Sequence, residues 1–231
     1  MFLATHLIGF GAGGANATRV WQNVKTYSSS AATSYTFNSV ATGGPGLLVV
    51  TVTAGRGVGS GSVSSVTVGG NSCTLAAQAT GYTEFNNVAM ISCLATITST
   101  GGSQNIVVNL NATGGNYQFC AIDCYVLSDL QSSTPYATST VATTVSSTAA
   151  NLTLSIPAGG IAIASLLQAN NSTLSTTNIT FDQNAVVNNP NVLRGWAVGS
   201  GQQLAAQSMS IVNTNGASSS VARVTAAASW I

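Results

Sequence analysis

The chain of 231 residues has few side chains that could perform acid–base or nucleophilic chemistry. Its single histidine is His6, and its four carboxylates are Glu84, Asp123, Asp129 and Asp182. A Ser-His-Asp site would have to use His6, and the sequence contains no Gly-x-Ser-x-Gly elbow for a nucleophilic serine. Glycoside hydrolysis needs two convergent carboxylates, and no spacing in the sequence indicates such a pair. We therefore expect no enzyme activity, no catalytic residue and no cofactor.

A glycine-rich motif lies near the beginning of the chain. Residues 9–14, Gly-Phe-Gly-Ala-Gly-Gly, match the dinucleotide-binding pattern in letters. That motif needs a preceding strand, a following helix and an acidic residue about 20 positions later. The next acid is Glu84, and the residues that follow the glycines alternate like a strand. We therefore interpret residues 1–18 as a glycine-rich arm.

Four cysteines could bind a metal ion or form disulfides. Cys120 and Cys124 lie in a segment that alternates like a strand, so their spacing separates them by about 13 Å. A disulfide needs α-carbons within about 7 Å, and one zinc ion could not reach both sulfurs. We expect both to be buried free thiols and expect no metal site. Cys73 and Cys93 are expected to be reduced in a cytosolic product, although the sequence leaves open whether either pairs with another cysteine.

The large aromatic residues have two alternative uses. Three tryptophans, together with Tyr27, Tyr82 and Tyr136, could form a platform on which a sugar stacks. In a β-sandwich, aromatic residues more often anchor a core or an interface, and we assign the tryptophans to that use. With the apolar residues of the arm, the candidate assembly residues are Leu7, Ile8, Phe10, Trp21, Trp196 and Trp230.

Composition narrows the class of protein. Charged residues make up 4% of the chain, where an ordinary domain has about 25%. The hydrophobic share of 45% is not typical of a disordered chain. A net charge of +1 gives little electrostatic repulsion between copies. We therefore expect a surface that packs in a dense assembly such as a virion lattice, with an extracellular module of low charge as the alternative.

The distribution of charge and apolar residues argues against two further classes. The basic residues form neither a run nor a patch interleaved with aromatics, and they are Arg19, Lys25, Arg56, Arg194 and Arg223. Nucleic-acid binding needs a basic footprint, so we expect none. No run of about 18 apolar residues predicts a membrane span. No basic residue precedes the apolar stretch 2–10, so we do not expect a secretory signal.

The elements that must position these residues are strands. Leu47 to Val50 is apolar on both faces, which predicts a central strand covered on both sides. Val88–Ile97 and Tyr117–Leu127 have the same pattern, and Gly69-Gly70 between two alternating segments predicts a hairpin turn. About a dozen short segments of this kind predict an all-β fold, an antiparallel β-sandwich of jelly-roll or immunoglobulin-like type.

The same segments predict the domain organisation. After the arm, 1–18, we expect a single β-sandwich domain over 19–231. The Ser- and Pro-containing stretch 128–135 is the best linker, so a sub-boundary there is the alternative. We do not divide the chain at this point because each half has too few predicted strands to close a sandwich. Trp230 at the end predicts a docked last strand, and the arm is expected to be held by its own fold or by a neighbouring molecule.

Several of these segments carry a family resemblance. They are the glycine-rich opening 1–14, Ser34-Tyr-Thr-Phe37, Leu47–Thr53, Val63–Gly70, Val88–Ile97, the Gly101-Gly102 turn, Ile106–Leu110 and Tyr117–Leu127. In them the chain resembles a β-sandwich domain common in structural proteins of tailed phages and prophages. The resemblance covers residues 1 to about 130 and extends to the remainder only in style.

This resemblance implies a non-enzymatic virion structural protein, a head decoration or spike component ahead of a tail or fibre component. The implied partners are copies of the chain itself and other virion proteins, such as the major capsid protein or tail and portal proteins. The implied location is the virion, with synthesis in the cytoplasm of the bacterial host. The family offers no catalytic residue. The alternative is a carbohydrate-binding or adhesin module, which leaves a glycan receptor open as a partner.

Overall fold

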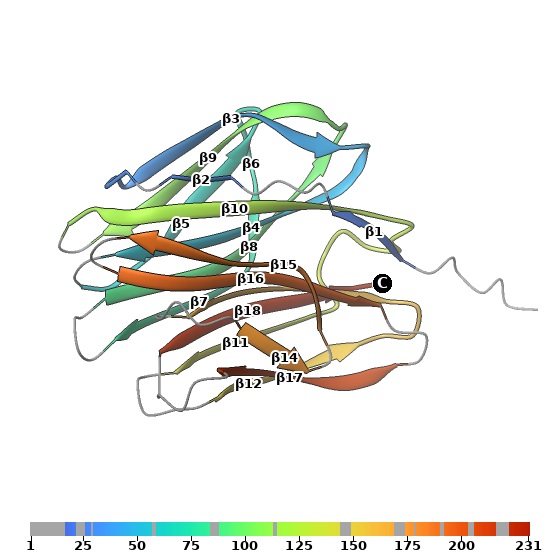
Figure 1. Ribbon diagram of the computed structural model, residues 1–231. Coiled ribbons are helices and arrows are strands. Elements are labelled where there is room, and N and C mark those ends of the chain that lie inside the picture. The colour runs from blue at the N-terminus through green and yellow to red at the C-terminus, as the bar shows by residue number, and fades with distance from the viewer. Residues whose placement is uncertain are drawn as a thin grey trace, which may run out of the picture.

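The computed structural model describes residues 17–21, 26–28, 30–56, 59–83, 88–112, 115–143, 149–168, 174–177, 179–189, 192–202, 206–215 and 222–231. These residues form eighteen β-strands and no helix, and all strand pairs are antiparallel (Figure 1). Fourteen of the strands have at least seven residues. The predicted fold class, an all-β antiparallel β-sandwich, is confirmed.

The first half of the chain forms two sheets. Sheet A has the strand order β1-β10-β4-β8-β7, and β2 also pairs with β10. Its strands are β1 (Thr18–Trp21), β2 (Thr26–Ser28), β4 (Gly46–Arg56), β7 (Thr74–Thr83), β8 (Val88–Ser99) and β10 (Tyr117–Ser128). Sheet B has the order β3-β9-β5-β6, with β3 (Ser34–Gly43), β5 (Gly61–Val68), β6 (Asn71–Ser72) and β9 (Gly102–Ala112). Facing side chains of the two sheets form the first core, which includes Tyr35, Leu48, Val50, Val66, Ile106 and Ile122.

The second half forms two more sheets. Sheet C has the order β11-β18-β13-β16-β15, with β11 (Ala137–Thr143), β13 (Ile161–Gln168), β15 (Thr180–Asn189), β16 (Val192–Gln202) and β18 (Arg223–Trp230). Sheet D has the order β12-β17-β14, with β12 (Ala149–Ile156), β14 (Leu174–Thr177) and β17 (Gln207–Asn215). A smaller core that includes Leu152, Leu154, Leu166 and Ile179 lies between them.

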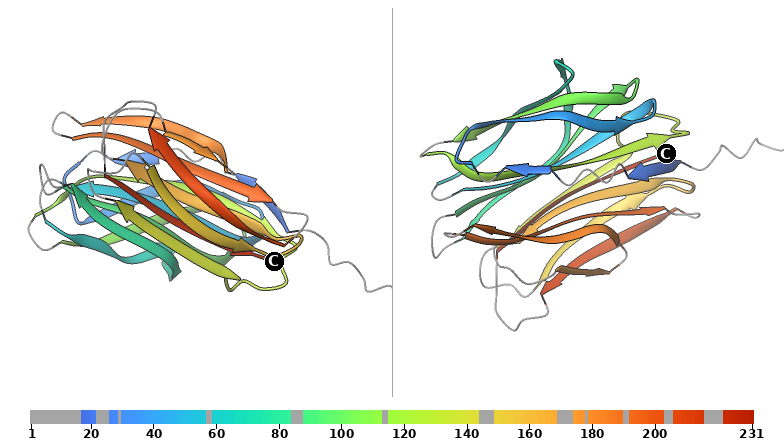
Figure 2. Two further views of the ribbon diagram at one scale, coloured as in Figure 1. Left: turned by 90° about the horizontal axis from the view of Figure 1, so that it is seen from below. Right: turned by 45° about the horizontal axis from the view of Figure 1, so that its top comes forward.

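Sheets A and C pack face to face, so the molecule has four layers in the order B, A, C, D (Figures 1 and 2). The core between them contains residues of both halves, and we call it the shared core. Its larger members are Leu47, Val49, Met90, Leu94, Phe119, Tyr125, Ile163, Leu167, Val224 and Trp230. Ser92 of β8 also donates its hydroxyl to the carbonyl of Ser165 on β13, at 2.7 Å.

This layering explains the strands that are apolar on both faces. β10, β13 and β18 lie in the two inner sheets, and nearly all their residues are buried. Because a strand of an inner layer contacts apolar neighbours on both sides, it lacks the polar face of an outer strand. The predicted central strands in 47–50, 88–97 and 117–127 all belong to sheet A. Trp230 is fully buried on the last strand, as the sequence indicated.

The passage between the halves falls at the predicted sub-boundary, 128–135. The chain leaves sheet A after Ser128 and enters sheet C at Ala137. Each half supplies two sheets of its own, which corrects the expectation that a half-chain has too few strands for a sandwich. The prediction of a single domain over 19–231 now depends on the shared core, which gives both halves a common interior.

Candidate functional site

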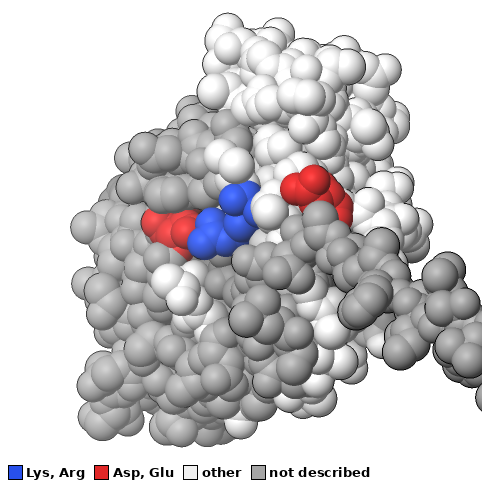
Figure 3. Space-filling model, turned by 90° about the vertical axis from the view of Figure 1, so that its right-hand side faces the viewer, with Lys and Arg blue, Asp and Glu red and all other residues white. Residues whose placement is uncertain are grey.

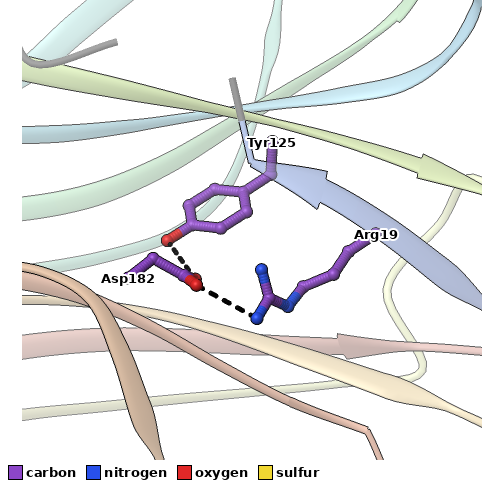
Figure 4. A network of polar contacts seen from close by, with 3 residues as sticks. All are labelled: Arg19, Tyr125 and Asp182. Carbon is purple, nitrogen blue, oxygen red and sulfur yellow. Dashed lines mark hydrogen bonds and ion pairs between the residues drawn. The ribbon is translucent and has the colours of Figure 1, made fainter. Parts of the chain in front are cut away.

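A polar network joins the two halves at the side of the shared core. Arg19 on β1 forms an ion pair with Asp182 on β15, with 3.0 Å between guanidinium nitrogen and carboxylate oxygen. Tyr125 on β10 donates its hydroxyl to the same carboxylate at 3.0 Å. The guanidinium also lies 6.0 Å from the centre of the Tyr125 ring. Figure 4 shows the three side chains converging from three strands, and we call them the seam network.

A β-bulge places the carboxylate of this network. The register of β15 against β16 shifts between Phe181 and Gln183, so Asp182 is the extra residue of a bulge. An extra residue bends the strand and re-aims a side chain. Arg19 comes from a strand that pairs with β10 opposite Leu127, two residues from Tyr125. The bulge in β15 therefore positions Asp182, and the regular pairing of β1 with β10 positions Arg19 near Tyr125.

The chemistry of the seam network is that of a clamp. Burial raises the pKa of the Tyr125 hydroxyl far above its ordinary value, and the nearby carboxylates of Asp182 and Asp123 raise it further. The phenol therefore keeps its proton and serves as a hydrogen-bond donor. A carboxylate with an arginine and a tyrosine as partners is already occupied on two sides. The arrangement favours holding two sheets together over proton transfer to a substrate.

A second polar cluster lies beside the seam network. The hydroxyls of Thr18 and Ser128 are hydrogen-bonded to each other at 2.6 Å, and both lie within hydrogen-bonding distance of one carboxylate oxygen of Asp129, at 3.1 and 3.2 Å. Asp129 has a positive φ of 58°, a conformation that aspartate adopts more readily than most residues. Among the side chains that the structure describes, the charged ones that reach the surface are Arg19, Asp129 and Asp182. Charged side chains gather on one face in Figure 3.

A shallow groove begins at Asp129 and follows the end of sheet A. Two depressions of about 320 and 260 Å³ share Leu47, Thr98 and Ser133, and a third of about 150 Å³ shares Thr98 with them and reaches Gln104. Most of the polar lining consists of hydroxyl side chains. We call this surface the hydroxyl groove, and its hydroxyl residues are Ser72, Thr74, Thr96, Thr98, Ser99, Thr100, Ser128, Ser133 and Thr134.

The hydroxyl groove offers neutral hydrogen-bonding groups. Thr98 and Ser133 are exposed, and within the described part of the chain their hydroxyls make no hydrogen bond. Asp129 is the one acid in the lining of the three depressions. Ligand pockets commonly hold about 300–1,000 Å³, so the combined groove could accept part of an extended, uncharged polar ligand.

The structure describes the side chain of only one of the six predicted assembly residues. Leu7, Ile8 and Phe10 lie outside the described residues. Trp21 and Trp196 belong to β1 and β16, but their side chains lie outside the description. Trp230 is completely buried in the shared core, so it is a core residue and not part of an exposed surface. The expectation of an interface role for Trp230 is therefore corrected.

The cysteines lie where the strand pattern places them. Cys93, Cys120 and Cys124 are fully buried free thiols in the first core, and Cys73 is a partly buried free thiol that packs against it. Burial raises the pKa of Cys73 to about 11 and of Cys93 to about 12, so both are protonated near neutral pH. None of the four is in a disulfide. The described residues contain no cluster of three or more potential metal ligands.

Sequence reasoning did not find the seam network. Arg19, Tyr125 and Asp182 are far apart in the chain, and none lies in a motif. The sequence shows only that Asp123 and Tyr125 are two residues apart in a segment that alternates like a strand, and both are buried on β10. No helix in the described part of the chain could cross a bilayer. Comparisons of the chain with known protein families, with curated proteins and with solved structures find no match.

Proposed function

We propose that the protein is a non-enzymatic structural component of a tailed-bacteriophage virion, with a capsid decoration or spike role ahead of a tail role. Its partners would be copies of itself and other virion proteins, such as the major capsid protein or the tail and portal proteins. The sequence resemblance suggests the virion, and an all-β sandwich is the fold that this resemblance implies. The proposed location is the particle, after synthesis in the host cytoplasm.

One observation carries the assembly role, namely the absence of charge from the described sheet edges. The outermost strands are β1, β2, β3, β6, β7, β11, β12, β14 and β15. The charged residues of these strands are Arg19 and Asp182, and these two bind each other. Soluble monomers usually place charges, especially lysine, on sheet edges to prevent pairing between molecules. Edges without such charges are suited to a protein that functions packed against other chains.

The proposal is tested by measuring the protein in purified particles of the phage or prophage that encodes it. Quantitative mass spectrometry should find the chain at a fixed number of copies relative to the major capsid protein across independent preparations. Washing the particles with high salt should leave this ratio unchanged, because few charges are available to hold the chain in place. Absence from the particles, or a ratio that varies between preparations, would refute the proposal.

The hydroxyl groove favours a second candidate function, a carbohydrate-binding or adhesin module. Tyr136 is 59% exposed and follows Pro135, which lines the groove. An exposed aromatic ring beside neutral hydrogen-bonding groups is a common arrangement for holding a sugar. Glycan-array binding that is lost in Tyr136→Ala would support this function. Val20→Ala is the matched control, because Val20 is also 59% exposed but lies on β1.

A further inference from the structure

The β3 strand leaves one side of its backbone without a partner. It is the edge strand of sheet B and pairs with β9 on one side. Figure 1 shows it at the outer margin of the molecule. Among the other edges, β6 has two residues and β14 has four, and β7 packs against β11. The β15 edge is as long as β3, but it carries a charged residue, Asp182, which is paired with Arg19. At ten residues, β3 is a long edge that faces outward.

The register shows which backbone groups point away from the molecule. The amide of Leu110 donates to the carbonyl of Thr33, and Ser34 lies opposite Asn109. In an antiparallel pair, hydrogen-bonded and non-hydrogen-bonded positions alternate, so Tyr35 and Phe37 bond inward to β9. The N–H and C=O groups of Ser34 and Thr36 therefore point outward, and the described residues provide no hydrogen bond to them.

The strand is held in a conformation that is ready to pair. Tyr35 and Phe37 are buried in the first core. The Tyr35 hydroxyl donates to the carbonyl of Tyr117 at 2.8 Å and to that of Ser30 at 3.0 Å. A preorganised strand loses little conformational entropy when a partner binds. Pairing would therefore need no rearrangement of residues 34–37.

The side chains at this edge permit a close approach. Ser34 and Thr36 are exposed, small and uncharged, and β3 contains no charged residue and no proline. A register shift between Phe37 and Val40 disrupts the edge beyond this point, because a bulge interrupts regular pairing. The pairing segment is therefore short and spans residues 34–37.

We infer that β3 is a self-association edge, on which a second copy of the chain pairs antiparallel about a two-fold axis near Tyr35. Ser34 of each copy would lie opposite Thr36 of the other, and the backbone groups of these residues would exchange hydrogen bonds. The two four-stranded B sheets would become one sheet of eight strands. Such an interface uses the same residues on both copies, as closed dimers do. The biological role of this dimer rests on the proposed assembly function, whereas the pairing of the two β3 strands can be tested independently of that function.

The test measures the mass of the full chain in solution by light scattering after size exclusion, over a range of concentrations. The wild-type chain should form a dimer. Ser34→Lys/Thr36→Lys places like charges opposite each other in the pair and should weaken dimerisation by at least about tenfold. Thr36→Ser should leave the dimer unchanged. Thr153→Lys/Ser155→Lys puts the same charges on exposed positions of β12 and should also leave it unchanged.

Circular dichroism and thermal melting confirm that each variant is folded before its mass is interpreted. A wild-type monomer at every concentration, or a dimer that persists in Ser34→Lys/Thr36→Lys, would overturn the inference. Dissociation of Thr153→Lys/Ser155→Lys to the same extent would also overturn it, because the effect would not be specific to β3. The composition of purified particles separates the two claims. If the chain dimerises through β3 in solution but is absent from particles, the virion function alone is refuted. If the chain is present in particles but does not dimerise through β3, this inference alone is refuted.

Discussion

Trp230 provides the strongest test of the shared core. It is completely buried among residues of sheets A and C, so Trp230→Ala removes a large side chain from the contact between the two halves. Truncating a buried tryptophan to alanine typically costs about 3–5 kcal/mol. A domain is stable by only about 5–15 kcal/mol. The substitution should therefore remove a large part of the free energy of unfolding.

Trp230→Phe should be much milder. The indole Nε1 atom is buried and has no hydrogen-bond partner among the described residues, so phenylalanine loses no hydrogen bond and relieves the cost of an unsatisfied donor. The smaller ring leaves a small cavity, and the net loss should be about 1 kcal/mol. Tyr136→Ala is the exposed control and should change the free energy of unfolding by less than about 0.5 kcal/mol.

The assay is equilibrium unfolding in urea, followed separately by circular dichroism and by tyrosine and tryptophan fluorescence. The wild-type chain should unfold in one transition by both probes, because the halves share an interior. Trp230→Ala should lower the midpoint without a large change in the slope. Two separate wild-type transitions, or a Trp230→Ala variant that unfolds within about 1 kcal/mol of wild type, would refute the reasoning.

Three further predictions concern single contacts. Tyr125→Phe removes a hydrogen bond to the Asp182 carboxylate and should cost about 1.5 kcal/mol in urea unfolding; an unchanged midpoint would contradict the clamp, and the exposed Tyr136→Phe is the control. The Cys93 thiol ionises near pH 9 in the unfolded chain, but in the folded chain its pKa is raised to about 12. Between these two pH values only the unfolded chain loses the proton, so the free energy of unfolding should fall as pH rises, by up to about 1.4 kcal/mol per pH unit. Cys93→Ala should make this loss shallower, and an equally steep loss would argue against a buried thiol. Gly70 has a φ of 84° and open space around an added Cβ, so Gly70→Ala should cost about 1 kcal/mol through backbone strain alone, whereas a neutral effect would show that the turn adapts.

The strands were the part of the fold that the sequence could predict. Leu47 to Val50 and the segment 117–127 have no polar face, and both lie in an inner sheet. The turn at Gly69 and Gly70 was predicted from the glycine pair, and both residues have positive φ angles. These features depend on local sequence periodicity, which a single chain displays directly.

The arrangement of the sheets could not be predicted in the same way. A strand such as β18, which is buried on both sides, could belong to any inner layer, because the pattern does not name the facing sheet. The seam network depends on a bulge at Asp182 and on three strands that are distant in sequence, neither of which leaves a local pattern. The position of Trp230 could not be predicted either, because an aromatic residue of a sandwich can anchor a core or an interface, and low overall charge makes the two resemble each other in composition.

The measurement that tests the central claim most directly is an electron cryomicroscopy reconstruction of the particles that contain this chain's gene. The account predicts density for a four-layer β-structure at repeated positions on the head or, as the second choice, on the tail. Copies should contact one another or the underlying proteins through sheet edges. Complete particles in which every repeated density is accounted for by other proteins would contradict the claim that this chain is a structural part of the virion.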